Sequence, residues 1–526
     1  MRSAFGRCLI VLGLIAPVSS GAQERYDLLL RGGRVLDGSG NPWVRADVAI
    51  RGDRISAVGA LGDAPGARVI DVSGLYVTPG FIDVHSHAGP GLASPGLSGA
   101  RPLIAQGIST VFVNPDGGGP IDLVAQREDL LEDGLGVNVA LLTPHGSIRI
   151  EVLGMGDRDP SSAELQRMRE LVRRGMEAGA FGLSSGLFYS PASFSETEEV
   201  VALAEVAAEF GGVYTSHIRD ESTYTVGLMA AVDEVIRIAR EGELPGVISH
   251  AKALGPHVWG FSTAIVERVE RARAAGVEVY ADQYPYEASG SGITSALVPR
   301  WAQEGGHEAM VARTREPALR DRIVAEMWEN LDRRGGADRL QFRRFEPDPS
   351  IEGKTLATVA ESRGMDPIQL ALALLEQGGA SFVSFNMNPG DVETLMRQPW
   401  TMTSTDGDLV PFGEGVPHPR SYGTYPRKLG RYVRDQGVID VAFAVRSMTS
   451  LPASVFRIED RGVLRPGAYA DVAVFDLAGI RDPATFQEPH QLAEGMVYVV
   501  INGELVMEAG RFTEARPGRV LHRSRQ

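Results

Sequence analysis

Six side chains that can bind metal ions stand where short apolar stretches of the sequence end. They are His85, His87, Asp116, His217, His250 and Asp406. Side chains two residues apart on a strand point the same way, so His85 and His87 form half of a site. Imidazole and carboxylate groups together suit zinc or another borderline divalent ion. One histidine at a strand end is usually structural, but six such residues at matching positions predict a metal site.

The elements that must position these residues alternate between short apolar strands and helices. The clearest helix is 161–178, where Ser161 and Glu164 form a capping-box pattern. The expected strands, besides 81–84, are 110–113, 137–142, 181–184, 213–217, 246–250, 278–283, 382–385 and 401–405. This repetition predicts an α/β fold with a parallel sheet, and about eight strands favour a (β/α)8 TIM-like barrel. A doubly wound open sheet is the alternative, but no Gly-x-Gly-x-x-Gly turn follows an early strand.

Both ends of the chain predict small antiparallel strands. Those near the start are 27–30, 34–36, 47–51, 54–58 and 67–71, and those near the end are 470–475, 496–501 and 504–508. Gly-rich turns separate the early strands, and Asn502-Gly503 is typical of a hairpin. We expect one small β-sandwich domain built from 23–77 and 456–526, with the barrel at 78–455 between them. A charged helical insertion at about 300–346 is either a cap over the barrel mouth or an ordinary surface insertion.

The bulk composition excludes some classes of partner. The 526 residues carry a formal net charge of −15, which disfavours nucleic acid and anionic membrane surfaces. Residues 1–22 read as a signal peptide, with Arg2 and Arg7 ahead of an apolar run at 8–18 that is too short to span a membrane. The single cysteine, Cys8, would leave with it. We therefore expect a periplasmic or secreted chain with no disulfide, no membrane span and an undetermined oligomeric state.

Six stretches, in this order, resemble the D-aminoacylase (N-acyl-D-amino-acid deacylase) family of the amidohydrolase superfamily. They are 80–87 (GFIDVHSH), 182–189 (GLSSGLFY), 216–221 (SHIRDE), 249–252 (SHAK), 404–407 (STDG) and 418–427 (HPRSYGTYPR). Together they span most of the chain that would remain after signal-peptide removal. The resemblance implies a barrel joined to a β-domain and hydrolysis of the amide bond of an N-acyl-D-amino acid.

The resemblance also implies how the metal ligands divide. One Zn²⁺ ion would be held by His217 and His250, and a second position by His85, His87 and Asp406. Zinc is the default metal, and another divalent metal or a single ion is the alternative. The bridging residue is a carboxylated lysine in many superfamily members and typically a cysteine in the D-aminoacylases. This chain has no lysine before Lys252 and no cysteine after Cys8. Alignment of 110–117 on the family's cysteine strand puts Asp116 at the position of the cysteine, so we expect Asp116 to bridge the two metal positions. The alternative is that Asp116 is only a turn residue before three glycines.

Mechanism and substrate contacts follow from these assignments. A metal-activated water would attack the amide, with Asp406 as general base and then acid. Tyr189 or His145 would help polarise the carbonyl, although His145 could equally hold a neighbour by a hydrogen bond. Candidates for binding the substrate carboxylate are Lys252, Tyr284, Tyr286 and Arg420, because lysine and arginine pair with carboxylates.

Three other functions remain open from the sequence. A dipeptidase or an L-acyl-amino-acid hydrolase could use the same site. A cyclic amidase of the dihydropyrimidinase type is disfavoured, because the bridging lysine it would need is missing. A metal-free, non-enzymatic relative is disfavoured by the retained His85, His87, His217, His250 and Asp406.

Overall fold

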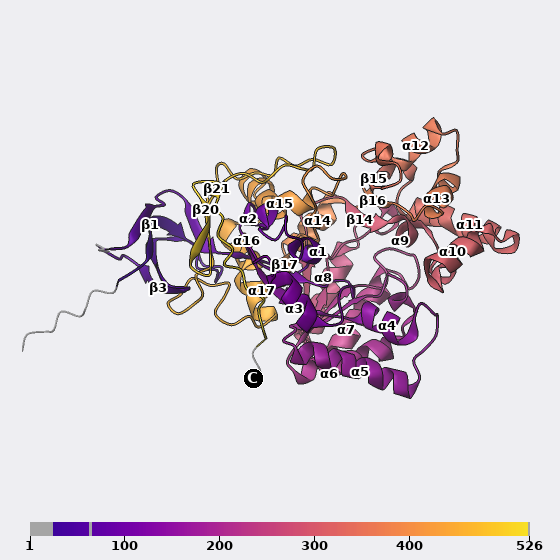
Figure 1. Ribbon diagram of the computed structural model, residues 1–526, viewed down its shortest axis with the longest axis horizontal. Coiled ribbons are helices and arrows are strands. Elements are labelled where there is room, and N and C mark those ends of the chain that lie inside the picture. Colours follow the sequence, from indigo (N-terminus) through magenta and orange to yellow (C-terminus); the bar gives the residue numbers. More distant parts are fainter. Residues whose placement is uncertain (1–24, 63–65, 524–526) are drawn as a thin grey trace, which may run out of the picture.

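The computed structural model describes residues 25–62 and 66–523. The expected signal peptide lies outside these residues. The described chain has a β-domain at one end, a barrel in the middle and a separate mixed lobe at the other end (Figure 1). Within these ranges, no helix combines the length and the apolarity that crossing a membrane requires.

A closed parallel barrel forms the centre of the described chain, which confirms the predicted fold class. β8 and β9 are one strand interrupted at Leu142, with β7 paired on one side and β10 on the other. The barrel closes where Asp406 N donates to His85 O at 2.9 Å and His87 N donates to Gly407 O at 3.0 Å. Its strands are β6 (Phe81–Asp83), β7 (Ile108–Val113), β8 (Asn138–Leu141) with β9 (Thr143–Pro144), β10 (Gly182–Gly186), β11 (Val213–His217), β12 (Gly246–Ile248), β13 (Val279–Gln283) and β17 (Thr401–Thr403).

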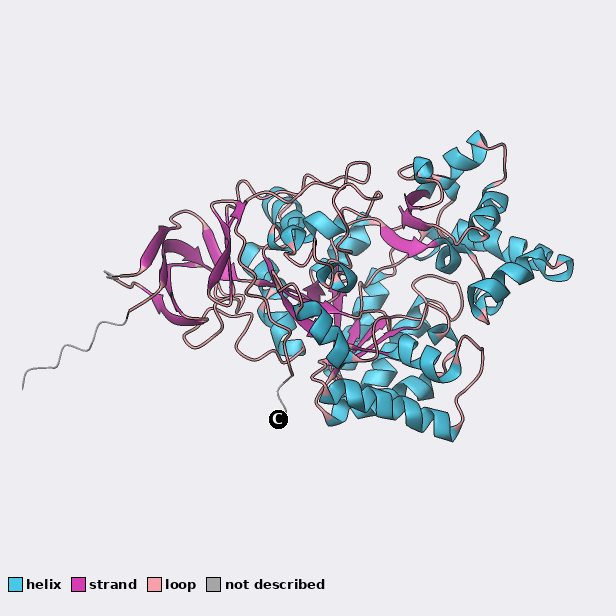
Figure 2. Cartoon of the chain, in the orientation of Figure 1, coloured by secondary structure: helices cyan, strands magenta, loops and turns pink. Residues whose placement is uncertain are grey.

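A helix follows each barrel strand and covers the outside of the barrel (Figure 2). α5 confirms the predicted helix, because Ser161 and Glu164 form the capping box. The covering helices are α2 (Arg101–Ile104), α3 (Leu123–Leu131), α5 (Ser162–Glu177), α6 (Thr197–Glu209), α7 (Leu228–Glu241), α8 (Ser262–Ala274), α14 (Pro389–Met396) and α16 (Val441–Met448). Shorter helices at the loops are α1 (Gly89–Leu92), α4 (His145–Leu153), α15 (Arg420–Arg427), α17 (Ser450–Val455), the 3-10 helices η1 (Ala192–Phe194) and η2 (Pro256–Val258), and the π-helix η6 (Lys428–Asp435).

The two chain ends share one nine-stranded sheet, in which β5 pairs with both β1 and β18. Two expectations about it were wrong. Residues 31–33 form a bulge inside a single strand and not a turn between two, and β4 runs parallel to β1. The Asn502-Gly503 hairpin is confirmed, with φ of 48° and 85°. The strands are β1 (Leu28–Val35), β2 (Val44–Arg51), β3 (Arg54–Gly59), β4 (Arg68–Asp71), β5 (Tyr76–Pro79), β18 (Val472–Phe475), β19 (Met496–Ile501), β20 (Glu504–Glu508) and β21 (Arg511–Phe512).

The insertion after β13 begins earlier and ends later than the expected 300–346. Residues 382–385, expected as a barrel strand, belong mostly to its antiparallel sheet, because β16 pairs with β14 and β15. An apolar core of its own, including Leu340, Phe342 and Phe382, stabilises the lobe. Its elements are β14 (Ser289–Gly292), α9 (Ile293–Leu297), η3 (Arg300–Gln303), α10 (Gly306–Arg315), α11 (Pro317–Arg333), η4 (Ala337–Arg339), β15 (Leu340–Arg344), η5 (Pro349–Ile351), α12 (Leu356–Ser362), α13 (Pro367–Leu375) and β16 (Ser381–Ser384).

Candidate metal centre and active site

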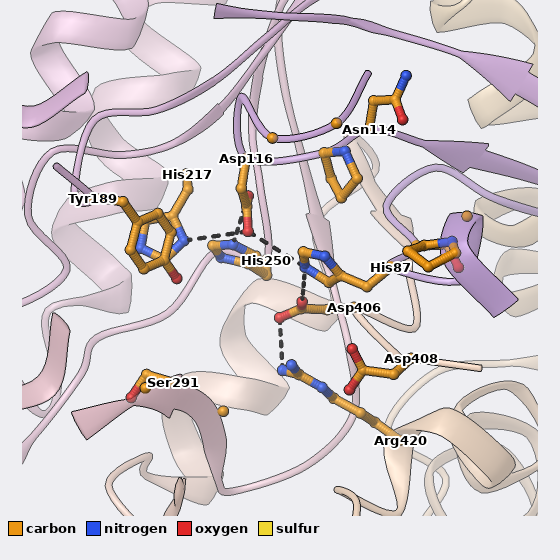
Figure 3. Close-up of a pocket in the computed structure, with 18 of the residues that line it drawn as sticks. His87, Asn114, Asp116, Tyr189, His217, His250, Ser291, Asp406, Asp408 and Arg420 are labelled. Atoms are coloured by element: carbon orange, nitrogen blue, oxygen red, sulfur yellow. Dashed lines mark hydrogen bonds and ion pairs between the residues drawn. The ribbon is translucent and has the colours of Figure 1, made fainter. Parts of the chain in front are cut away.

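The six predicted ligands meet at the carboxyl end of the barrel. Figure 3 shows five of them, with Asp116 between His217 and His87. Asp116 Oδ1 lies 3.3 Å from His85 Nε2 and 3.5 Å from His250 Nε2. Asp116 Oδ2 lies 3.4 Å from His87 Nε2 and 3.9 Å from His217 Nδ1. Asp116 is therefore common to two groups of ligands, one with His85, His87 and Asp406 and one with His217 and His250.

The backbone of Asp116 is held in an uncommon conformation by the next strands. Its φ is 55°, in the left-handed region that costs free energy for a residue with a side chain. Ser184 Oγ donates to Asn114 O at 2.6 Å, and Ser147 N donates to Gly117 O at 3.0 Å. A Cβ on Gly117 would lie 2.9 Å from Gly146 N, so a larger residue would push this turn away. The turn thereby directs the carboxylate into the barrel mouth.

The polar atoms of this cluster fit a divalent cation. His85 Nε2, Asp116 Oδ1 and both ring nitrogens of His217 are buried and have no hydrogen-bond partner among the described residues. Buried polar atoms normally have a hydrogen-bond partner, and a bound metal ion would take the place of that partner here. Burial lowers the pKa of His217 to about 3, which leaves a neutral imidazole ready to ligate. Burial raises the pKa of Asp116, but the imidazoles of His85, His250 and His87 outweigh it and hold that pKa well below its usual range.

Glu221 holds two functional side chains behind the ligands, a role that the sequence did not reveal. Its Oε1 accepts from Lys252 Nζ at 2.5 Å and lies 3.1 Å from His250 Nδ1. A carboxylate on the far nitrogen fixes the orientation of a ligating imidazole. Glu221 stands four residues after the predicted ligand His217. This short spacing was the one feature of the sequence that could have indicated its role beside the metal ligands. Asp282 Oδ1, also unpredicted, accepts from His250 N at 2.9 Å.

Arg420 contacts the predicted catalytic carboxylate. Its Nη1 donates to Asp406 Oδ2 at 2.6 Å, while Asp406 Oδ1 lies 3.2 Å from His87 Nε2. The guanidinium stacks on Tyr284, with Cζ 4.6 Å from the ring centroid. Burial opposes ionisation of Asp406, but Arg420, His250 and His87 outweigh it and keep its pKa well below the usual range. Asp406 is therefore a carboxylate with one oxygen held by Arg420 and the other near the histidines.

A cavity of about 650 Å³ opens over the cluster. The predicted substrate residues that line it are Tyr189, Lys252, Tyr284 and Arg420. The insertion contributes Ser289–Gly292, Arg334 and Arg343 to its wall. A pocket of this size beside a metal-binding cluster suits a small-molecule substrate.

Two predicted substrate residues lie elsewhere. Tyr286 donates to Asp482 Oδ2 at 2.7 Å and is not part of the cavity lining. His145 is fully buried, with Nε2 2.9 Å from Glu199 Oε1, and Arg149 pairs with the same glutamate. Neither side chain is placed to touch a substrate in this cavity, because its hydrogen-bonding group faces a protein carboxylate.

Barrel, ligand cluster and cavity together define a metal-dependent hydrolase of the amidohydrolase type. The profile of the Amidohydrolase family matches residues 68–507. The chain belongs to this family.

Characterised relatives match along nearly their whole length. N-acyl-D-glutamate deacylase of Alcaligenes xylosoxydans xylosoxydans is 36% identical and covers 95% of this chain and 97% of the relative. D-aminoacylase of the same organism is 34% identical, over 96% and 100%. Its N-acyl-D-aspartate deacylase is 33% identical, over 95% and 96%.

A solved structure of N-acyl-D-glutamate deacylase from Bordetella bronchiseptica, complexed with zinc and a phosphonate inhibitor, has a TM-score of 0.81 and 34% identity, covering 95% of this chain and 100% of that one. The structure of a D-aminoacylase that defines a novel subset of amidohydrolases has the same values. A further D-aminoacylase structure concerns a binuclear metal centre. These neighbours agree with the two groups of ligands found here.

Proposed function

We propose that this chain hydrolyses the amide bond of N-acyl-D-amino acids. The observation that carries the proposal is the position of Asp406, which lies between the histidine pair and Arg420 at the floor of a cavity for small molecules. The relatives named for such activities match 95% and 96% of this chain. A divalent ion held by the six ligands, zinc being the natural choice, would supply an activated water and polarise the carbonyl.

The protein side of the reaction is then assigned to individual atoms. Asp406 Oδ1, which faces the histidines, accepts a proton from the attacking water and later delivers it to the leaving amine. Arg420 keeps Asp406 ionised and fixes its orientation through Oδ2. Tyr189, whose ring centroid lies 4.6 Å from that of His217 at a tilted angle of 55°, closes the opposite side of the cluster and excludes water.

The free carboxylate of the substrate needs cationic partners in the same cavity. Lys252, Arg420 and Tyr284 converge there, because Lys252 Nζ and Arg420 Cζ lie 5.7 and 4.6 Å from the centroid of the Tyr284 ring. Arg420 Nε is buried without a hydrogen-bond partner among the described residues. These groups hold the carboxylate next to the scissile amide, so that the amide carbonyl faces the ligand cluster.

Amine release from zinc-loaded enzyme tests this function directly. We expect metal-dependent release from N-acetyl-D-amino acids and none from the L-enantiomers or from dipeptides. Release from L-substrates or dipeptides would move the function to an L-acylase or a dipeptidase on the same site. Absence of release from all of them would overturn the proposal in favour of a cyclic amidase or a non-enzymatic relative, which metal analysis of the same sample would separate.

We also propose that the chain is exported and acts in the periplasm or outside the cell. The support is the sequence of residues 1–22, with two early arginines, an apolar run and small residues at 20–22. N-terminal sequencing of protein recovered from a periplasmic fraction should begin near residue 23. Recovery of the intact N-terminus from the cytoplasm alone would contradict export.

A further inference from the structure

One cationic side chain in the cavity has no carboxylate to neutralise it. Four cationic residues line the cavity, and three have carboxylate partners. These pairs are Lys252 with Glu221, Arg343 with Asp408, and Arg420 with Asp406. The fourth is Arg334, which makes no ion pair among residues 25–62 and 66–523.

Arg334 is buried in the insertion. It directly follows α11 and is only 1% exposed. Its Nη1 donates to Ser384 Oγ at 2.9 Å, and Ser384 pairs with Ser289, a residue of the cavity wall. Its Nε is buried and has no partner in the described part of the chain. The guanidinium thus donates to Ser384 Oγ and lies 5.8 Å from the Tyr224 ring centroid, but it faces no carboxylate in the described part of the chain.

A second arginine increases the positive charge around Arg334. Arg300 donates only to carbonyl oxygens, such as Ser295 O at 3.1 Å, and its Cζ lies 4.0 Å above the Phe188 ring. Burial lowers the pKa of Arg300 to about 10, and the charge of Arg334 adds to this shift. Asp220 acts on Arg300 through space, but its oxygens accept from the backbone N–H groups of 222, 225 and 227.

An unpaired guanidinium buried in this way destabilises a protein unless a ligand supplies an anion. Arginine also suits this task, because its planar fork matches a carboxylate with two parallel hydrogen bonds. The candidates for the substrate's α-carboxylate lie near Asp406, so Arg334 is available for a second anionic group on the same molecule.

We propose that Arg334 binds the side-chain carboxylate of the substrate, and that the chain acts on acidic N-acyl-D-amino acids of the glutamate or aspartate type. This inference rests on the proposed deacylase function. Overall similarity does not decide the side chain, since relatives named for D-glutamate, for D-amino acids in general and for D-aspartate are 36%, 34% and 33% identical. The unneutralised charge of Arg334 is what favours an acidic side chain on the substrate.

A matched substrate pair tests the proposal. N-acetyl-D-glutamate and N-acetyl-D-glutamine have nearly the same shape and differ in side-chain charge. Zinc-loaded wild-type enzyme should cleave the glutamate with a kcat/KM about 100-fold higher, the size expected from one hydrogen bond to a charged group. Arg334→Gln should lower kcat/KM for N-acetyl-D-glutamate by about 100-fold. For N-acetyl-D-glutamine, kcat/KM should stay within about three-fold of the wild-type value.

Controls separate charge recognition from structural damage. Arg344 is an exposed arginine that pairs with Glu346 and Glu414 and lies outside the cavity lining. Arg344→Gln should therefore leave kcat/KM unchanged for both substrates. Arg334→Lys should restore part of the preference for glutamate. Equal losses for both substrates in Arg334→Gln, with unchanged zinc content and melting temperature, would overturn the proposal and assign Arg334 to the shared α-carboxylate. Unchanged preference would also overturn it.

A measurement on the wild-type enzyme covers the case in which the variant does not fold. The product D-glutamate should inhibit hydrolysis more strongly than D-glutamine, and N-acetyl-D-aspartate should be cleaved faster than N-acetyl-D-asparagine. Cleavage of neutral D-substrates alone would overturn the acidic specificity while leaving the deacylase function intact. Cleavage of no D-substrate would instead contradict the deacylase function itself.

Discussion

Arg420 and the ligand cluster hold opposite oxygens of Asp406. Arg420 Nη1 donates to Oδ2 at 2.6 Å, whereas Oδ1 lies 3.2 Å from His87 Nε2. This division fixes the orientation of the carboxylate and leaves Oδ1 facing the place where water would be activated. Positioning and proton transfer are therefore separate tasks on the two oxygens of one side chain.

Asp406→Asn should lower kcat by about 10²- to 10⁴-fold, because an amide cannot take the proton from the attacking water. Zinc should stay bound, since His85, His87 and Asp116 remain. Steady-state kinetics with N-acetyl-D-amino acids and elemental analysis of the same preparation check both statements. Normal turnover in the variant would remove Asp406 from the mechanism.

Asp116→Ala should reduce the zinc content of the purified protein, because Asp116 is the one carboxylate common to both ligand groups. Asp116→Cys should retain more zinc than the alanine variant, since a thiolate can also ligate zinc. Elemental analysis after dialysis compares the three proteins. Full retention of zinc and of activity in Asp116→Ala would show that Asp116 is only a turn residue.

Glu221→Gln should weaken zinc binding by about 10- to 100-fold, as loss of a carboxylate behind a ligating histidine usually does. The physical reason is its position 3.1 Å from His250 Nδ1. Competition with a chelator measures the affinity, and Glu414→Gln, which alters an exposed ion pair with Arg344, is the matched control. Equal zinc affinity in both variants would contradict this role.

Lys428→Met should stabilise the protein more at pH 6.5 than at pH 9.5. Lys428 is 2% exposed, and its Nζ donates to Thr403 Oγ1 and Ser447 Oγ. Burial lowers its pKa to about 7, whereas the unfolded value is about 10.4. Protonation therefore favours the unfolded chain, with the full penalty below pH 7 and none above about pH 10.4.

The two hydroxyls left by this substitution can bond to each other, since their oxygens lie 3.2 Å apart. Thermal unfolding of both proteins at the two pH values measures the effect. We expect the melting temperature difference between variant and wild type to shrink as pH rises. A difference that is constant or grows with pH would show that the buried amine carries no such penalty.

The sequence determined the barrel and its ligands for a physical reason. Parallel strands end at one face of a barrel, so residues that follow different strands, such as His87, His217 and Asp406, must meet there. Residue type and strand position were therefore enough for a metal centre, whereas the assignment of Asp116 as the bridge came from the resemblance to the D-aminoacylase family. Local rules also sufficed for the α5 capping box and the Asn502-Gly503 hairpin.

Only the tertiary structure decided which side chains satisfy one another. Residues 382–385 have the composition of a barrel strand, yet they pair with β14 and β15 because the insertion has its own core. The sequence left two roles open for His145, and only the fold places its Nε2 2.9 Å from Oε1 of Glu199, 54 residues away in sequence. Whether a charge is neutralised depends on partners distant in sequence, so the pairing of Lys252 with Glu221 and the isolation of Arg334 could be seen only in the folded chain.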